Sequence, residues 1–244
     1  MRTFSVPDIS PVIGLSRNCV AHYKLNDNAA TTTVIDSREF SNGTAQQNTN
    51  LIHTTGKVAD ALTFNGTSDY IDTNATFLSI LQNSFSMNIW VYLAGYGEEM
   101  NYFFSMGALS GSGDWFAFEQ QTNFTLTVKY IVDSDVVDFV ADSGITTDVF
   151  YMITCVLEKL SATTINVGIY KNAVLVEESG AQTVSMGNFT GSNNLTIGAK
   201  KVGGDLFTPL AGVLDNAMIF SKALTQREVT FLYNLGYGTE GLLA

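Results

Sequence analysis

Hydrophobic and polar residues alternate over short stretches of the chain, and turn-forming residues separate these stretches. In the segment 85–92 the alternation passes into a continuous apolar run, which is typical of a strand with one face in a core. Comparable stretches predict strands at 19–25, 61–64 and 69–71, and near 101–106, 115–120, 124–131, 135–140, 150–157, 164–170, 173–178, 194–198 and 212–219. Turns at intervals of about 8–12 residues indicate an all-β antiparallel sandwich of two sheets.

One short segment near the C-terminus has the pattern of a helix. Thr225 and Glu228 form a capping box of the type S/T-x-x-E, and the pattern continues to Asn234. Gly236 follows as a residue that readily takes the left-handed conformation at a helix end. The sequence therefore predicts a single short C-terminal helix beside the sandwich.

The first residues of the chain lack a strand or helix period. Residues 1–16 contain Pro7, Pro11 and Gly14, and we expect them to form an extended N-terminal arm that lies on the domain or on a neighbouring subunit. No linker or internal repeat divides the remainder, so residues 17–244 are predicted to be one domain.

The acidic composition excludes several classes of partner. The formal net charge is −11, with 12 basic and 23 acidic residues and no basic run. Nucleic acid and anionic membranes both attract clustered lysine and arginine, so neither is an expected partner. No apolar run reaches the ~20 residues of a transmembrane helix, and the N-terminus lacks the apolar region of a Sec signal peptide.

Cysteine and histidine are too scarce for most metal or nucleophilic sites. Cys19 and Cys155 both lie in apolar runs, and their spacing leaves open whether they pair. His22 is expected on a strand surface and His53 in a loop. Without C-x-x-C, H-x-x-x-H or G-x-S-x-G, neither a zinc site nor a serine triad is indicated.

Seven segments in order, between residues 20 and 236, resemble motifs of laminin-G-like modules in the concanavalin A-like lectin/glucanase superfamily. They are Tyr23-Lys24-Leu25-Asn26 with Asp36-Ser37 and Asn42-Gly43, Gly56 with Ala61–Ile71, Phe85–Val91, Tyr170–Val176, Leu195–Gly198, Gly212–Ala217 and Ala223–Gly236. The resemblance implies a concanavalin A-like jelly roll. The chain departs from the family at Ala173, where a hairpin glycine is usual, and at 150–154, which lacks the family's Trp-His pair.

The resemblance also bears on chemistry. Glucanases of this fold carry an E-x-D-x-(x)-E strand, because glycoside hydrolysis requires two carboxylates that face one sugar. That spacing is missing here, so we expect the protein not to be an enzyme.

A structural Ca²⁺ ion is a further expectation from the resemblance, since related modules often hold one between the early Asp-Ser loop and the last-strand Asp. Asp36 and Asp215 match these ligands, with Asn26 as a helper, and Ca²⁺ prefers such oxygen ligands. In the alternative interpretation, Asp36 accepts backbone N–H bonds in a turn and Asp215 pairs with a neighbouring loop.

Glycan binding in lectin-like sites depends on exposed aromatic rings beside polar loops. Tyr96, Tyr102 and Trp115 are the candidates, next to the loops 95–101 and 108–114. Core or rim packing is the competing interpretation of Trp115. Trp90 lies in an apolar strand and is expected in the core.

Two functions fit these expectations. A start at Met1 without a signal peptide, together with a composition rich in Thr, Ser, Asn and Gly, favours a bacteriophage virion protein. In that role it would decorate a capsid or form part of a fibre, dock on neighbouring subunits and bind host glycans. The alternative is a carbohydrate-binding adhesion module of an exported cell-surface protein.

Overall fold

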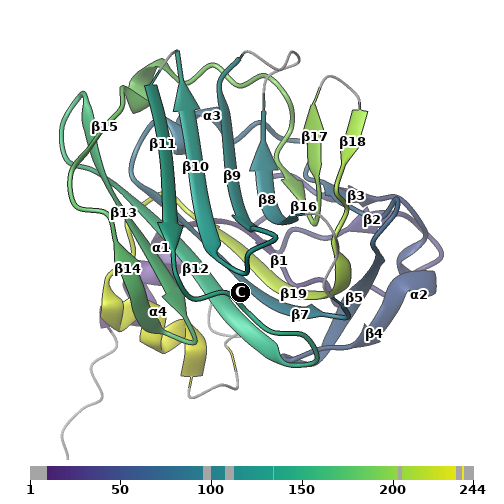
Figure 1. The fold of residues 1–244 in the computed structure, drawn as a ribbon. Helices are drawn as coiled ribbons and strands as arrows, with labels where there is room; N and C mark the ends of the chain where they lie inside the picture. Colours follow the sequence, from purple (N-terminus) through teal and green to yellow (C-terminus); the bar gives the residue numbers. More distant parts are fainter. Residues whose placement is uncertain are drawn as a thin grey trace, which may run out of the picture.

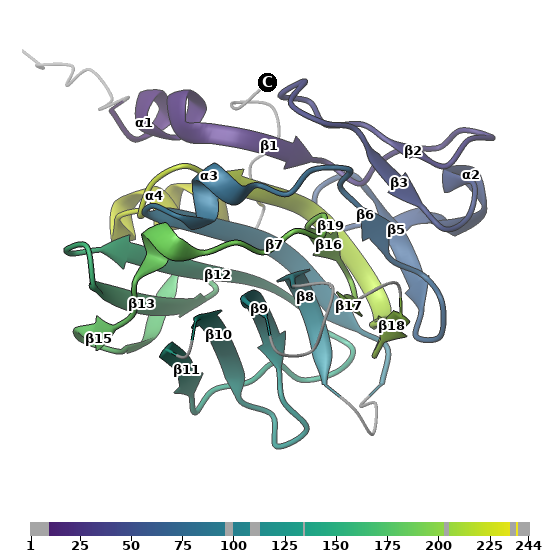
Figure 2. The ribbon, with the colours of Figure 1, turned by 90° about the horizontal axis from the view of Figure 1, so that it is seen from above.

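Two antiparallel β-sheets face each other in the computed structural model, as Figures 1 and 2 show. The structure describes residues 10–95, 100–107, 113–133, 135–202, 205–234 and 238. The expected two-sheet sandwich is confirmed, and the predicted strands are present with ends shifted by a few residues.

The first sheet, called sheet A, contains nine described strands. Their order is β14 (Val174–Glu178), β13 (Thr164–Lys171), β12 (Phe150–Lys159), β7 (Phe85–Leu93), β19 (Ala211–Phe220), β5 (Asp60–Asn65) and β4 (His53–Thr55). In addition, β1 (Cys19–Tyr23) pairs with β19, and β15 (Gln182–Thr183) pairs with β13.

The second sheet, called sheet B, contains eight described strands. Their order is β11 (Asp135–Ala141), β10 (Leu126–Val132), β9 (Trp115–Gln120), β8 (Asn101–Met106), β16 (Thr196–Ile197), β6 (Ile71–Asp72), β3 (Gly43–Ala45) and β2 (Thr33–Val34). A separate hairpin, β17 (Lys200–Val202) and β18 (Asp205–Phe207), stands beside β8. Single helical turns are α2 (Thr49–Ile52), α3 (Leu78–Leu81) and the 3₁₀ turn η1 (Met186–Asn188).

Aromatic rings fill much of the space between the sheets. Phe85 of β7 meets Phe116 of β9 edge to face, with ring centroids 5.3 Å apart. Because side chains alternate along a strand, Phe116 and Phe118 point into the core while Trp115 and Glu119 point to the opposite face of sheet B. This alternation directs Glu119 of β9 to the outer side of sheet B.

A second apolar cluster covers the outer face of sheet A. Helices α1 (Ser10–Asn18) and α4 (Gln226–Tyr233) pack there against residues such as Met218 and Phe220 of β19. Trp90 is 1% exposed, as expected of a core residue, and stacks on Tyr233. The central strands of sheet A are therefore buried on both faces, while the edge strands β14 and β4 remain partly exposed.

Helix α1 corrects the expectation of an extended arm for residues 10–16. Pro11 is compatible with a first helical turn, where the N–H that proline lacks has no partner within the helix. A side chain at Gly14 would lie 2.7 Å from Glu228 Oε1, so glycine permits the close approach of α1 to α4. Residues 1–9 lie outside the described residues.

Helix α4 begins as the sequence predicts. The Thr225 side chain accepts a hydrogen bond from the Glu228 N–H, and the Glu228 carboxylate accepts one from Thr225 N–H, which completes the capping box. The left-handed residue at the end is Asn234, with φ of 44°. Gly236, predicted for that place, lies outside the described residues. No described helix has the length and apolar content needed to cross a bilayer.

Both cysteines are buried and unpaired. Cys155 of β12 belongs to the core between the sheets, whereas Cys19 of β1 belongs to the cluster under α1 and α4. They lie on opposite faces of sheet A, which explains why no disulfide forms. Burial raises the pKa of each thiol to about 12.

The turn between β13 and β14 keeps its hairpin shape without the family's glycine. Asn172 and Ala173 both have positive φ, 50° and 62°, as a two-residue hairpin of this kind requires. Asn172 Oδ1 accepts a hydrogen bond from the Met152 N–H at 3.0 Å, which ties the turn to β12. The substitution thus changes the turn residue and leaves the hairpin in place.

His22 is buried, so its expected place on a strand surface is wrong. β1 is covered by the loop that contains Asp36, and the His22 imidazole contacts the side-chain oxygen of Asn216 on β19. Burial lowers the pKa of His22 to about 4, and the bond to Asn216 opposes this shift only in part.

This lowered pKa predicts a loss of stability in weak acid. The unfolded chain, with an ordinary histidine pKa of 6.5, binds a proton that the folded chain does not bind until the pH approaches 4. Neutral, buried His22 therefore makes its full contribution to the free energy of unfolding above pH ~6.5. This contribution, about 3 kcal/mol in all, is lost as the pH falls from 6.5 to about 4. Urea unfolding between pH 7 and 4.5 measures the loss.

The matched control is the other histidine. His22→Gln should flatten the pH dependence between pH 6.5 and 4.5, whereas His53→Gln should keep it, because the effect is assigned to the fully buried imidazole of His22. An equal pH dependence in both variants contradicts the assignment to His22.

Candidate functional site

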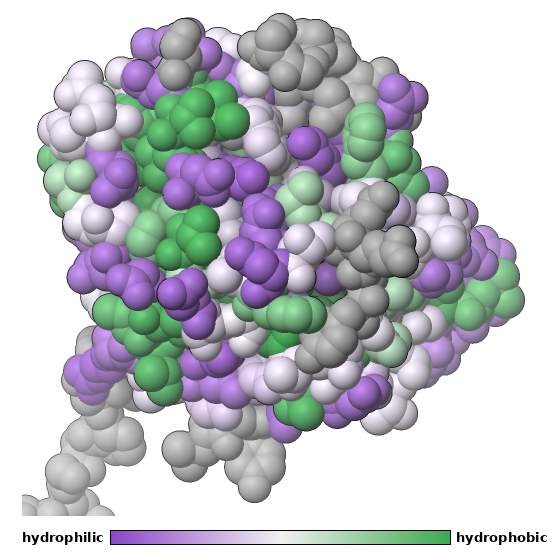
Figure 3. All heavy atoms as spheres, in the orientation of Figure 1, coloured by the Kyte–Doolittle hydropathy of each residue, from purple (hydrophilic) through white to green (hydrophobic). Residues whose placement is uncertain are grey.

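The outer face of sheet B carries one continuous row of side chains across all eight strands. Each member pairs with the next: Asp138, Lys129, Ala117, Ser105, Thr196, Asp72, Thr44 and Thr33. Figure 3 shows hydrophilic and hydrophobic side chains intermixed over β10 and β11, where the exposed Val136 and Val140 lie on either side of Asp138. The centre of the row is made of small residues.

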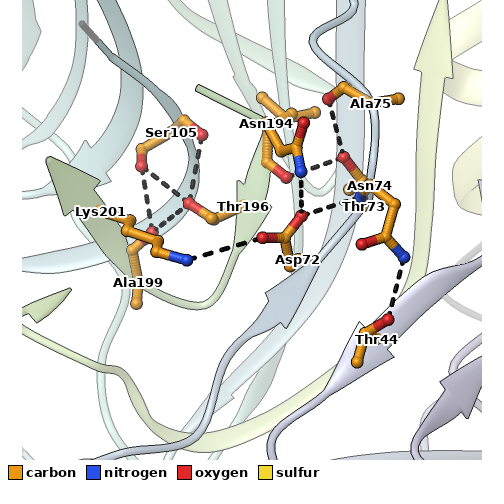
Figure 4. A network of polar contacts seen from close by, with 11 residues as sticks. Thr44, Asp72, Thr73, Asn74, Ala75, Ser105, Asn194, Thr196, Ala199 and Lys201 are labelled. Atoms are coloured by element: carbon orange, nitrogen blue, oxygen red, sulfur yellow. Dashed lines mark hydrogen bonds and ion pairs between the residues drawn. The ribbon is translucent and has the colours of Figure 1, made fainter. Parts of the chain in front are cut away.

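The segment that leads into β17 folds over this centre. The Ala199 carbonyl oxygen accepts hydrogen bonds from Ser105 Oγ at 3.1 Å and Thr196 Oγ1 at 2.7 Å, as Figure 4 shows. These bonds bury both hydroxyls and fix the start of β17 on the sheet. As a result, Lys200 and Lys201 lie over opposite halves of the row.

Lys200 contacts two of the aromatic residues predicted to bind glycans. Its Nζ lies 3.9 Å from the ring centroid of Trp115 and 5.8 Å from that of Tyr102. Trp115 is half-buried, and Tyr102 is 2% exposed. The structure therefore brings these two predicted residues together, but an ammonium group covers their rings. Tyr96, the third, lies outside the described residues.

A buried carboxylate lies behind these rings. Glu119 is fully buried, and its Oε1 is 3.6 Å from Lys129 Nζ. Burial raises the pKa of Glu119, while the neighbouring Lys129, Tyr102 and Lys200 oppose the shift. Burial likewise lowers the pKa of Lys200. We call Trp115, Tyr102, Lys200, Glu119 and Lys129 the Lys200 cluster, an ion-pair network closed by aromatic rings.

Asp72 organises the other half of the row. Its Oδ1 accepts hydrogen bonds from Asn194 Nδ2 at 2.8 Å and Asn74 N–H at 2.9 Å, and Lys201 Nζ is 3.7 Å from its Oδ2. Asn74 Nδ2 in turn donates to Thr44 Oγ1 at 2.9 Å. Figure 4 shows Asp72 at the centre of these contacts. The network fixes the side chains of Asn74 and Asn194, and both residues also line a groove.

This groove, the Phe40 groove, has a volume of about 590 Å³. Phe40 forms one wall, 54% exposed, and its ring packs on Phe77 with centroids 5.1 Å apart. The other lining residues are Asn74, Ala75, Thr76, Leu78, Ser79, Gln82 and Asn194. A smaller groove on the other side of Phe40 is lined by Ile35, Asp36, Glu39, Ser41 and Asn42. An exposed ring thus stands between two hollows.

Three amide side chains line the Phe40 groove with nitrogens that are already bonded to the protein. The amide nitrogens of Asn74, Asn194 and Gln82 all donate to protein oxygens, the last to the Phe189 carbonyl at 2.9 Å. Within the described residues no hydrogen bond reaches their side-chain oxygens. Hydroxyl groups of a ligand can donate to these oxygens while an apolar face packs on Phe40.

Sequence reasoning missed this groove. Phe40 falls between the turn signals at 36–37 and 42–43, and a large aromatic residue within a turn-rich segment was the available signal. Its partners come from residues 74–82 and 194, which only the pairing of β3, β6 and β16 brings together.

Asp36 is satisfied by its own loop and by β1. Its Oδ1 accepts the N–H groups of His22 and Arg38, and its Oδ2 accepts those of Phe40 and Ser41, at 2.8–3.1 Å. This is the turn-capping arrangement that the sequence offered as the alternative to calcium binding. It also fixes the backbone on either side of Phe40.

Asp215, the second predicted calcium ligand, contacts a different loop. Its Oδ2 accepts hydrogen bonds from the N–H groups of Lys57 and Val58, both at 2.7 Å. A side chain at Gly56 would lie 2.6 Å from the same oxygen, which explains a glycine there. Asn26 is exposed. In the part of the chain described, no three His, Cys, Asp or Glu side chains form a metal-binding group. Calcium binding stays a prediction.

Removal of the Asp36 carboxylate should destabilise the fold even when no metal is bound. We expect Asp36→Ala to lower the free energy of unfolding by about 3–5 kcal/mol, because four backbone N–H groups lose a charged acceptor. Urea denaturation in EDTA measures this. Asp27→Ala is the control, since Asp27 accepts the Ile35 N–H at the surface, and it should cost under ~1 kcal/mol.

The calcium prediction has its own measurement on the unmodified protein. A bound structural ion stabilises the folded state by mass action, so EDTA should lower the melting temperature relative to CaCl₂. An unchanged melting temperature contradicts calcium binding.

Comparisons with known proteins place the fold. Domain 4 of AbnA, a GH43 extracellular arabinanase from Geobacillus stearothermophilus, in complex with arabinotriose, is similar with a TM-score of 0.64. The two are 21% identical over 88% of this chain and 97% of that domain. The CBM40 of the Ruminococcus gnavus IT-sialidase, also solved with alpha2,3 sialyllactose, has a TM-score of 0.58 at 12% identity, over 70% and 95%.

A sialidase mutant from Trypanosoma rangeli that displays trans-sialidase activity has a TM-score of 0.66 at 13% identity, over 95% of this chain but 36% of that one. No curated protein matches the chain. The family model of the concanavalin A-like lectin/glucanases superfamily matches residues 65–230, more than half of the chain. The two-sheet fold and the family match lead to the same conclusion: the chain belongs to the concanavalin A-like lectin/glucanase superfamily.

Proposed function

We propose that the protein binds carbohydrate in the Phe40 groove. The observation that carries the proposal is the exposed Phe40 ring beside three amide oxygens that make no hydrogen bond within the described residues. Sugars combine an apolar ring face with hydroxyl donors at the edge. An aromatic wall with polar acceptors beside it complements both features.

The Lys200 cluster is the weaker candidate for the same function. Sugar stacking requires an accessible ring face, whereas Tyr102 is buried and Lys200 already lies on Trp115. A ligand there must first displace a cation from its ring, at a cost of about 0.5–2 kcal/mol. Phe40 requires no such step.

The similar structures support a carbohydrate ligand without naming it. One was solved with arabinotriose and another with alpha2,3 sialyllactose. On this proposal the protein acts outside cells, as a binding module without catalytic activity. Decoration of a virion, with docking on neighbouring subunits, rests on the sequence alone and stays a prediction.

Truncation of Phe40 tests the proposal. Phe40→Ala should weaken binding of the best ligand found on a glycan array by about tenfold or more, since loss of a stacked ring costs on the order of 1–2 kcal/mol. Isothermal titration calorimetry with that ligand measures the change.

Two controls make the result specific. Phe124 is similarly exposed, at 47%, in the turn between β9 and β10, and Phe124→Ala should bind like the unmodified protein. Trp115→Ala should also retain most of the affinity. Loss of binding in Trp115→Ala but not in Phe40→Ala moves the site to the Lys200 cluster and contradicts the proposal.

A further inference from the structure

We infer that the Phe40 groove selects neutral glycans and rejects acidic ones. This inference rests on the proposed function and goes beyond it by assigning the chemical class of the sugar. Three observations carry it: the uncharged lining, the fixed direction of the amide groups, and the charge of the whole chain.

The lining contains no ionisable side chain. All nine residues of the groove are aromatic, aliphatic, hydroxyl or amide residues. Recognition of a sugar carboxylate normally uses a cation or several converging N–H donors. Two cations lie beside the lining: Lys201 is 3.7 Å from the Asp72 carboxylate and is paired there, and Lys159 Nζ donates to the backbone carbonyl of Gln82 at 3.0 Å.

The amide groups are oriented by bonds behind the groove. Asp72 Oδ1 holds the Asn194 nitrogen, while the Asn42 carbonyl and Thr44 hydroxyl hold the Asn74 nitrogen. Exchange of oxygen and nitrogen at Asn194 would place its amide oxygen against the carboxylate oxygen of Asp72. The amide oxygens of Asn74 and Asn194 therefore remain available to a ligand as acceptors, while Asn194 keeps a second N–H that can donate.

A neutral sugar and an acidic sugar meet this arrangement differently. A sugar hydroxyl donates to an amide oxygen, whereas a carboxylate has no proton to donate and is repelled by the same oxygen. The hydroxyls of Thr76 and Ser79, and the second N–H of Asn194 and of Gln82, can donate to either class and do not distinguish them. The formal charge of −11 adds a general repulsion of anions. Both effects disfavour uronic and sialic acids.

A glycan array with neutral, uronate and sialylated members tests the inference. We expect the bound members to be neutral, and their binding to fall by tenfold or more in Phe40→Ala but not in Phe124→Ala. Lactose and alpha2,3 sialyllactose, titrated separately, provide a neutral and acidic pair with a shared core. The acidic member should not bind more tightly than the neutral one.

A charge added to the groove provides a gain-of-function arm. Ser79 is exposed in the lining, and Ser79→Lys should raise affinity for uronate or sialylated members at least fivefold over the unmodified protein. Ala162→Lys adds the same charge at an exposed turn between β12 and β13 and should produce no such gain.

The outcomes separate the inference from the proposed function. Acidic glycans that bind the unmodified protein and are lost in Phe40→Ala overturn the neutral class and leave glycan binding in place. Absence of all binding, or binding that Phe40→Ala does not change, overturns the proposed function itself. A gain equal in Ser79→Lys and Ala162→Lys shows a general charge effect and contradicts selection by the groove.

Discussion

The position of β19 in sheet A is the constraint on which the rest of the structure depends. β19 is the last described strand along the chain, yet it lies between β7 on one side and β5 and β1 on the other. Among the described strands, it alone joins the two halves of sheet A. Since these pairings join residues far apart in sequence, the sheet forms through non-local contacts, which slow folding.

The burial of sheet A on both faces of its central strands also limits which surface is left for the proposed ligand. The core covers one face of this sheet, and α1 and α4 cover the other. Among the described residues, the β17 segment crosses the outer face of sheet B, and the polar row of this face borders the groove beside Phe40. The proposed binding surface thus lies on the outer side of sheet B, whereas the core lies between the two sheets. Substitutions at exposed lining residues such as Phe40 and Ser79 should leave the packing between the sheets largely unchanged, whereas Phe77 belongs to that core.

The sequence predicted the fold better than the site, and the reason is physical. Strand alternation and the capping box of α4 are local, so Phe85–Leu93 and Thr225–Glu228 could be identified from adjacent residues. The Phe40 groove depends on strand pairs that no local pattern shows. The sequence also does not show which aromatic residues are buried. Tyr102 is of a residue type common in glycan-binding sites, but Lys200, almost 100 positions later in the chain, covers its ring.

The two buried cysteines have a practical consequence for studying the molecule. With a thiol pKa of about 12, each is almost entirely protonated at neutral pH and slow to react with alkylating agents or oxidants. The sequence contains no other thiol. A cysteine introduced at the rim of the Phe40 groove would therefore be the one fast-reacting position, and a fluorophore attached there could report a ligand directly. The native residues can stay in place for that purpose.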